Sequence, residues 1–227
     1  SQIDKDSTFL TLAGQAYLVD ARAVLERLDT ARQRVAAIGQ GQAGRIEVGL
    51  SGSHFLGPFP AALARYRQSH PGVDVVLHEM QPSLQQAALR DKRIHVGISR
   101  TAVNDDQLAS TLLWPDPVVA ALPPGHPLAA RKALALKDLR SEPFVMLRRD
   151  SSAHAEHMVQ CCVQAGFAPR VAQTTVELAA VLSLVAAGLG VALVPSSLGM
   201  LFGPRVVFKP LGAKAPRADV HAVQRRD

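Results

Sequence analysis

The sequence predicts an α/β protein of two similar lobes that follow a long helix. A β-α-β-α-β order of apolar strands and amphipathic helices occurs twice, after residue 44 and again after residue 142. A heptad pattern occupies the residues before the first repeat. The chain has 227 residues, of which 48% are hydrophobic and 19% charged, a composition that suits folded lobes with buried cores.

The first expected element is a helix over residues 7–38. Its apolar and small residues recur at alternating spacings of four and three, the pattern of a helix that packs lengthwise against another helix. They are Leu10, Gly14, Tyr17, Ala21, Val24, Leu28, Ala31, Val35 and Ile38. Ser7 is a candidate N-cap, and Gly39, Gly41 and Gly44 end the helix and supply a hinge. A helix packed on its own domain is the alternative, but the sustained heptad favours self-association.

The first repeat begins with a strand at residues 45–50 and an amphipathic helix at 58–70. A proline-glycine turn then leads into a second strand at 73–79. A helix at 83–92 precedes a third strand at 94–99, whose nearly continuous apolar character suits a central parallel strand.

The second repeat has the same plan. We expect strands at residues 143–147, 170–174 and 190–195, with helices at 152–165 and 176–187 between them. Each lobe is therefore expected to contain a small parallel sheet with its own helices.

Three further strands, at residues 118–122, 206–211 and 220–224, lie outside the two repeats. We expect the second of them to close the second lobe and the third to return to the first, so that the chain crosses twice between the lobes. The expected parts are a linker and dimerisation helix with its hinge at 1–43, a first lobe at 44–116 with 213–227, and a second lobe at 117–212. Two crossings make a hinged cleft, and such sheets bind ligands at the carboxyl ends of their strands.

Composition argues against several other classes of protein. The net charge of +6 comes from scattered Lys and Arg, with no long basic run and no aromatic platform, so a solvated surface is favoured over a nucleic-acid interface. No apolar stretch is long enough for a membrane helix, and no signal peptide is apparent. Adjacent Cys161 and Cys162 do not imply a disulfide framework. A cytoplasmic location is expected.

Hydroxyl side chains gather where predicted strands end and helices begin. They are Ser51, Ser53, Ser99, Thr101, Ser151, Ser152, Thr174 and Thr175. Helix starts present free N–H groups and a partial positive charge, so this ring suits a carboxylate. Arg100 and Arg148 could each add a guanidinium, one from each lobe. Helix capping alone is the alternative, and Thr174 with Glu177 has the spacing of a capping box.

The order of these segments resembles the LysR-type transcriptional regulators over nearly the whole chain. The matching segments are residues 10–14 with Leu18, Ala21 and Arg22 in the linker helix, 45–49 in the first strand, 59–79, 88–90 with 94–97, and 184–188 through 194–195. Among the branches of that family the chain looks closest to the one that regulates benzoate, catechol and chlorocatechol degradation.

The resemblance implies two Rossmann-like lobes of the type II periplasmic-binding-protein architecture, preceded by a long linker helix. It also implies effector contacts for Ser53 and Arg100. Where the branch carries a threonine this chain has Pro82 with Ser83 beside it, and Ser152 and His154 replace an apolar and aromatic pair. The pocket is therefore expected to be more polar. The candidate effector-binding residues are Ser51, Ser53, His54, Pro82, Ser83, Ser99, Arg100, Thr101, Arg148, Ser152, His154 and Thr175.

The resemblance implies a regulator rather than an enzyme, with a small anionic effector, self-association as a dimer or tetramer, and no cofactor or membrane partner. DNA would be bound through a winged helix-turn-helix domain preceding Ser1, and a final helix would follow Asp227. The alternative is a solute-binding protein of a transport system with the same two lobes. The long heptad helix argues against that alternative.

Three other chemistries were weighed. Ser51 lies in a segment similar to a hydrolase elbow, but Ser53 stands where the final glycine is needed, and no acid is suitably placed. His154, His157 and Cys161 share one helix face, a spacing that could hold zinc or nickel, although a cleft histidine beside a core cysteine is favoured. Neighbouring cysteines on a helix point apart, which disfavours a redox switch. No metal is expected.

Overall fold

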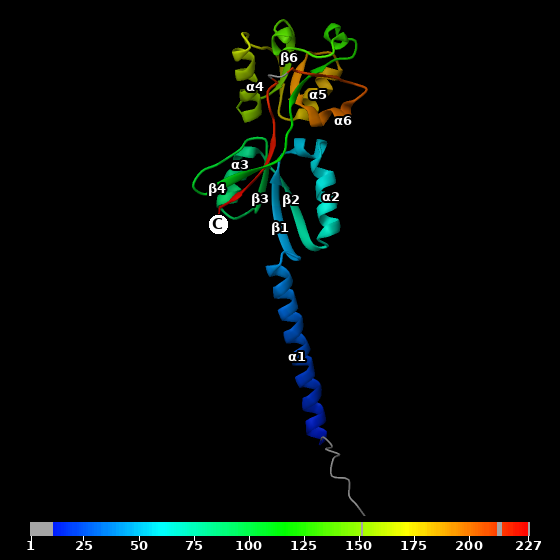
Figure 1. Cartoon of the computed structure of the whole chain (residues 1–227), viewed down its shortest axis with the longest axis vertical. Coiled ribbons are helices and arrows are strands. Elements are labelled where there is room, and N and C mark those ends of the chain that lie inside the picture. The colour runs from blue at the N-terminus through cyan, green and yellow to red at the C-terminus, as the bar shows by residue number, and fades with distance from the viewer. Residues whose placement is uncertain (1–10, 151, 213–214, 227) are drawn as a thin grey trace, which may run out of the picture. The chain divides into compact units, whose positions relative to one another are not determined.

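The computed structural model describes residues 11–150, 152–212 and 215–226 (Figure 1). The chain divides into two compact units. The smaller contains Ser1–Arg45 with Ser69–Asp74, and the larger contains Ile46–Gln68 with Val75–Asp227. None of the described helices is long and apolar enough to cross a membrane.

The smaller unit is dominated by α1, Leu12–Gly39. The hydroxyl of Thr11 accepts a hydrogen bond from the Gly14 N–H at 3.1 Å and caps the helix, whereas the expected cap, Ser7, lies outside the described residues. Gly41, in the left-handed region at φ 68°, follows the end of the helix. No residue of α1 is buried, and Val24 and Val35 are 67% and 69% exposed. Its apolar side chains therefore have no cover from the described part of this chain.

The first sheet of the larger unit has the strand order β2-β1-β3-β10-β4. Its strands are β1 Ala43–Leu50, β2 Gly72–Glu79, β3 Val96–Ser99, β4 Leu108–Trp114 and β10 Val220–Arg225. β1 and β3 are parallel, and β10 runs antiparallel to both β3 and β4. β4 was missed by the sequence analysis. It is an edge strand whose three leucine-rich terminal positions remain largely exposed, so it lacks a clear in-out alternation.

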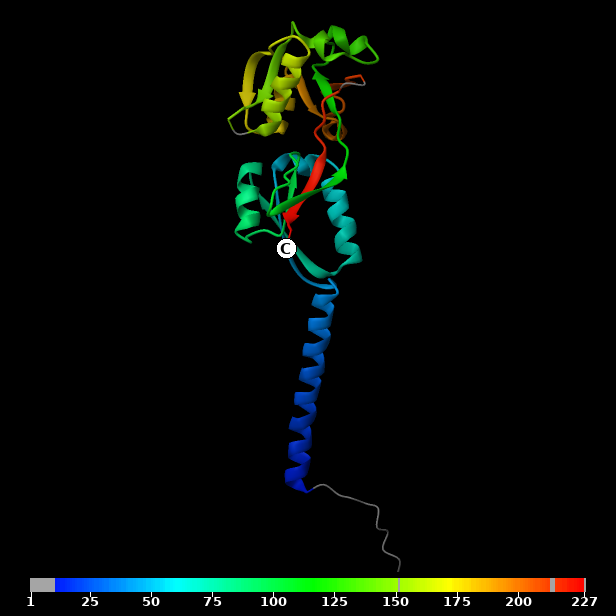
Figure 2. The ribbon, with the colours of Figure 1, turned by 60° about the vertical axis from the view of Figure 1, so that its left-hand side comes forward.

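Helices α2, Phe59–Ser69, and α3, Pro82–Arg90, lie on opposite faces of this sheet (Figure 2). Val48, Leu50 and Ile98 pack with Phe59 on the α2 face. The alternate positions of β1 and β3 are glycines, which lets α3 approach closely: a Cβ on Gly49 would lie 2.6 Å from Ile94 Cδ1. The period-two pattern of the strands thus gives each helix its own face.

The second lobe contains two small sheets. One has the order β8-β5-β9 and is antiparallel, and the other pairs β6 with β7 in parallel. The strands are β5 Val118–Leu122, β6 Pro143–Leu147, β7 Arg170–Thr175, β8 Ala192–Pro195 and β9 Val207–Pro210. A parallel bridge from Phe144 to Val191 links them.

Strand β6 lies between α4, Ala153–Gln164, and α5, Leu178–Ala186. Phe144 and Met146 pack in the core with α4, whereas Val145 belongs to the core that contains the α5 residues Val181 and Leu182. Figure 1 shows the two helices on either side of the strand. The short helices of the described chain are η1 Gly52–Leu56, η2 Pro127–Ala130, η3 Leu136–Leu139, η4 Ser196–Leu198 and α6 Gly199–Phe202.

The chain passes twice between the lobes, as predicted: β9 completes the second-lobe sheet and β10 returns to the first. The two crossing segments run side by side. Pro117 and Arg217 form an antiparallel bridge, and the Ala218 N–H donates to the Asp116 carbonyl at 2.9 Å. The lobe boundaries at residues 116/117 and 212/213 stay a prediction. The strands that flank them join different sheets.

Candidate functional site

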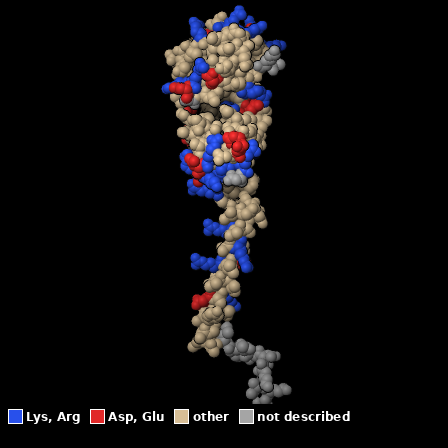
Figure 3. All heavy atoms as spheres, turned by 90° about the vertical axis from the view of Figure 1, so that its left-hand side faces the viewer, with Lys and Arg blue, Asp and Glu red and all other residues tan. Residues whose placement is uncertain are grey.

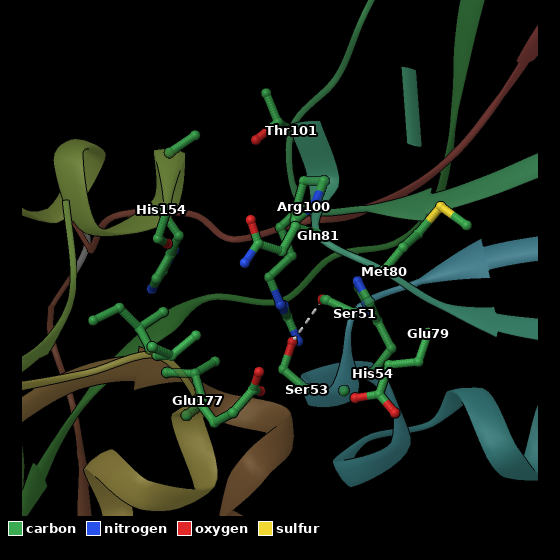
Figure 4. Close-up of a pocket in the computed structure, with 17 residues that line it drawn as sticks. Ser51, Ser53, His54, Glu79, Met80, Gln81, Arg100, Thr101, His154 and Glu177 are labelled. Atoms are coloured by element: carbon green, nitrogen blue, oxygen red, sulfur yellow. Dashed lines mark hydrogen bonds between the residues drawn. The ribbon is translucent and has the colours of Figure 1, made fainter. Parts of the chain in front are cut away.

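A cavity of about 260 Å³ lies in the larger unit and is lined by both lobes (Figure 4). The first lobe contributes Ser51, Gly52, Ser53, His54, Glu79, Met80, Gln81, Pro82, Arg100 and Thr101, and the second contributes Leu147, Ser152, Ala153, His154, Val176, Glu177 and Leu178. Most of these residues follow the carboxyl ends of strands, where open α/β sheets bind ligands. The volume is at the small end of the usual range for ligand pockets.

The outer surface of the lobes is less distinctive. On the face shown in Figure 3, Lys and Arg are interspersed with Asp and Glu over the lobes. The described residues on this face form no continuous basic field, in agreement with the scattered positive residues of the sequence. The cavity is therefore the feature from which a function can be argued.

The end of β1 places two hydroxyls in the cavity. Ser51 follows the strand directly, and Ser53 is buried in η1. Their Oγ atoms lie 3.3 Å apart (Figure 4). A hydroxyl both donates and accepts, so this pair can serve either kind of ligand atom.

The guanidinium of Arg100, at the end of β3, is anchored beneath the cavity. Its Nη1 donates to Asp116 Oδ2 and to the Ala218 carbonyl, each at 2.7 Å. Asp116 is 1% exposed and also accepts from the Ser196 hydroxyl at 3.0 Å, and from the Ser197 N–H at 3.0 Å and hydroxyl at 2.6 Å. This buried network ties the first lobe, both crossing segments and the end of β8 together.

The network changes what Arg100 can offer to a ligand. Burial lowers the pKa of Arg100 from its usual value, while the hydrogen bond and charge of Asp116 act in the opposite direction. Its positive charge is balanced by the Asp116 carboxylate. The buried Nε–H has no partner among the described residues, so Arg100 keeps one directed donor for the cavity that it lines.

The cavity contains two histidines that are uncharged at neutral pH. Burial, and then the positive charge of Arg100, lower the pKa of His54 to about 3 and that of His154 to about 4. His54 Nδ1 and His154 Nε2 are buried without a partner in the described chain. A hydrogen bond to the Leu193 backbone raises the pKa of His154, so a ring N–H donates there. Because Nε2 is unpartnered, the donor is Nδ1 and Nε2 is left as an acceptor.

Two carboxylates complete the cavity, and the sequence analysis did not single them out. A Cβ built on Gly52 would lie 2.6 Å from Glu79 Oε1 and 3.4 Å from Glu177 Oε2, so both groups approach one point from opposite lobes. Glu79 ends β2, and Glu177 is the residue before α5. Their positions at element ends were visible in the sequence, but their proximity was not.

The structure brings together eight of the twelve candidate effector-binding residues. The eight that line the cavity are Ser51, Ser53, His54, Pro82, Arg100, Thr101, Ser152 and His154. Ser83 and Ser99 instead line an adjacent pocket of about 280 Å³, which shares Pro82, Thr101 and Ser152 with the first. The Ser152 hydroxyl also accepts from the Ala155 N–H at 3.2 Å and so caps α4.

The remaining two candidates, Arg148 and Thr175, line neither pocket. The Arg148 side chain is 54% exposed and pairs with Asp150, and the Thr175 hydroxyl donates to the Glu177 carbonyl at 3.0 Å. Ser151 lies outside the described residues. The capping box of Thr174 with Glu177 was wrong, because α5 begins later, with Glu177 itself at the N-cap position.

The histidine and cysteine pattern of α4 does not converge. The Cys161 sulfur lies 3.8 Å from the ring Nε2 of His157, on an exposed part of the helix, whereas His154 turns to the cavity. No group of three or more His, Cys, Asp or Glu side chains suited to a metal occurs within the described ranges.

Comparison with known proteins identifies the family. Residues 39–227 match the family model described as the LysR substrate binding domain. This chain belongs to the LysR family of transcriptional regulators. Its fold is accordingly the two-lobed, type II periplasmic-binding-like fold of LysR effector-binding domains. The transport-protein alternative is not favoured by these findings.

Several relatives share this LysR architecture. The chain is 31% identical to the HTH-type transcriptional regulator XapR of Escherichia coli (strain K12), over 96% of the chain and 74% of XapR. It is 30% identical to the HTH-type transcriptional regulator AlsR of Bacillus subtilis (strain 168), over 96% of the chain and 72% of AlsR. With CatR of Pseudomonas putida the identity is 32%, over 83% and 64% respectively.

Solved structures agree with this LysR assignment. The BenM effector binding domain with its effector benzoate superposes with a TM-score of 0.73 at 29% identity, covering 81% of this chain and 84% of that one. The LysR family regulator CbnR superposes with a TM-score of 0.82 at 25% identity, covering 96% and 76%. CbnR has also been solved with its target DNA.

Proposed function

We propose that this chain is the sensing part of a LysR-type regulator that binds a small organic carboxylate in the cavity shared by its two lobes. The observation that carries the proposal is the double role of Arg100. It lines the cavity with an unpartnered Nε–H, and the same guanidinium holds the crossing segment through Asp116. A ligand that engages Arg100 therefore acts on the group that connects the lobes.

A carboxylate is supported by the donors around Arg100. The hydroxyls of Ser51, Ser53 and Thr101 line the same cavity, and the start of α4 adds free N–H groups near Ser152. The structure of BenM with benzoate and the similarity to CatR favour an effector from aromatic catabolism.

Signal transmission requires a second copy and a DNA-binding part. The exposed apolar face of α1 supports self-association through that helix. CbnR, which was solved with its target DNA, supports a DNA-binding domain outside this chain as the receiver of the signal. Closure of the lobes would then alter the relative positions of the DNA-binding heads.

A thermal-shift measurement tests the carboxylate proposal. Benzoate, cis,cis-muconate and short mono- and dicarboxylates are added to the wild-type chain, to Ser53→Ala, and to Ser183→Ala. Ser183 is a matched control because its exposed hydroxyl donates to the Ala179 carbonyl within α5, outside the cavity lining. A ligand at one hundred times its Kd adds about 2.7 kcal/mol of stability, which raises Tm by several degrees.

We expect at least one carboxylate to raise Tm in the wild type and in the control, and to raise it less in Ser53→Ala. If no carboxylate stabilises the wild type, or if Ser53→Ala responds like the control, the proposed site is wrong.

A further inference from the structure

The charge of the cavity lining differs from that expected for a pocket that binds a plain anion. Arg100, whose charge is balanced by Asp116, is joined there by the uncompensated carboxylates of Glu79 and Glu177. His54 and His154 are neutral. A ligand with only negative charge would therefore approach two carboxylates without a compensating positive charge, which is unfavourable.

The two carboxylates converge from opposite lobes. Both reach the position that a Cβ on Gly52 would occupy, with Glu79 Oε1 within 2.6 Å and Glu177 Oε2 within 3.4 Å of it. Figure 4 shows the Glu177 carboxylate directed across the cavity toward Ser53. No ion pair joins either glutamate to a Lys, Arg or His among residues 11–150, 152–212 and 215–226. Like charges held this close favour a ligand that places a positive group between them.

An independent observation also indicates that the cavity awaits a ligand. The side chain of His54 is 3% exposed, lines the cavity and has an unpartnered Nδ1. Buried polar atoms are nearly always hydrogen-bonded in folded proteins. His154 Nε2, also buried, is an unpartnered acceptor. The cavity thus holds unsatisfied acceptors as well as the donor of Arg100.

We infer that the ligand carries a cationic nitrogen, such as an ammonium or amidinium, which lies between Glu79 and Glu177. The inference rests on the proposed function, because it concerns the same cavity, and it narrows the ligand to a small zwitterion. The carboxylate of that ligand faces Arg100 and Ser53, and its nitrogen faces the glutamates. Because one glutamate comes from each lobe, the positive group draws the lobes together and gives the ligand a direct means of favouring closure.

Matched compounds separate the two charged groups. One set is benzoate, benzylamine and 4-(aminomethyl)benzoate, and the other is pentanoate, pentylamine and 5-aminopentanoate. Their Kd values are measured by calorimetry, together with Tm shifts, on the wild type, Glu79→Gln, Glu177→Gln and Glu142→Gln. Glu142 is the control, since its carboxylate pairs with His126 outside the cavity lining.

In at least one set we expect the aminocarboxylate to bind ten-fold or more tightly than the carboxylate that lacks the amine. Glu79→Gln and Glu177→Gln should each remove most of this advantage, while the plain carboxylate binds as before or more tightly. Glu142→Gln should behave like the wild type.

The inference is overturned if carboxylates bind and the amine adds nothing, an outcome that leaves the proposed function intact. It is also overturned if the advantage survives both glutamate substitutions. If no compound of either set binds, the inference fails, and the broader carboxylate screen decides the proposed function separately. Magnesium and manganese chloride are tested alone. A stabilisation by either metal that depends on both glutamates would replace the organic cation with a metal ion.

Discussion

Arg100 Nη1 lies 2.7 Å from Asp116 Oδ2, and this buried ion pair joins the end of β3 to the segment that crosses between the lobes. The Arg100 side chain is 9% exposed and that of Asp116 1%. Desolvation makes such a pair costly, so its remaining hydrogen bonds matter. The hydroxyls of Ser196 and Ser197 and the Ala218 carbonyl supply them. The pair is therefore a structural connection as well as part of the ligand cavity.

Replacing Asp116 should destabilise the chain strongly. Asp116→Ala leaves the Arg100 charge buried without its partner, and breaking one side of a buried pair costs about 3–5 kcal/mol. Urea unfolding of the wild type and variant measures the loss. Asp150→Asn is the control, because its pair with Arg148 is more than half exposed and should contribute about 0–1 kcal/mol. Equal losses in the two variants would contradict a special role for the buried pair.

Stability should fall as the pH is lowered through the range set by the cavity histidines. The pKa values of His54 and His154 are about 3 and about 4 in the fold, against 6.5 for an ordinary histidine. Below pH 6.5 the unfolded chain binds protons that the folded chain does not, so the free energy of unfolding decreases as pH falls. Between pH 7 and pH 5 each histidine should account for about 2 kcal/mol.

The readout for this prediction is a slope rather than a single stability. Urea unfolding is followed at several pH values for the wild type, His54→Gln and His70→Gln. The control His70 lies in the smaller unit, away from the cavity. His54→Gln should show a shallower pH dependence between 7 and 5, and an unchanged slope would exclude His54 as a buried neutral base.

The exposed face of α1 should mediate self-association. Val24 and Val35 lie on the predicted heptad seam, and no residue of the helix is buried in this chain. Val24→Glu combined with Val35→Glu should shift the sedimentation equilibrium toward monomer, because the charges would be buried in the contact. Gln33→Glu, at a polar position where Gln33 Nε2 donates to Asp29, is the control. A wild type that is monomeric at all concentrations contradicts this role.

Gly190 should not tolerate a side chain. Its φ is 156°, and a Cβ there would lie 2.4 Å from the Pro143 carbonyl oxygen, beside the bridge that links the two second-lobe sheets. Backbone cannot move aside as a flexible side chain can, so Gly190→Ala should cost at least about 1–3 kcal/mol. Gly39→Ala, with nothing within 4 Å, should be neutral or slightly stabilising. Tm measurements of both variants decide the matter.

Local patterns were sufficient to predict much of the fold. The βαβ order of each lobe follows from apolar strands alternating with amphipathic helices, and the structure places the strands and helices close to the expected residues. Ser51 and Ser53 could be assigned to the cavity because they directly follow β1, and the carboxyl ends of parallel strands meet at one edge. The linker helix likewise followed from its period of seven.

What local patterns could not show was which distant side chains meet. Asp116 lies between two prolines and looks like a residue of an exposed turn, yet it is buried because Arg100 and Ser197 converge on it from other parts of the chain. Glu79 and Glu177 each look like a solvated residue at the end of an element. Only the folding of two lobes around Gly52 brings their carboxylates to the same point. The sequence by itself determined the elements and the hydroxyl edge of the cavity, through interactions between near neighbours. The tertiary structure decided the charge of the cavity, since electrostatic interactions depend on distance in space rather than along the chain.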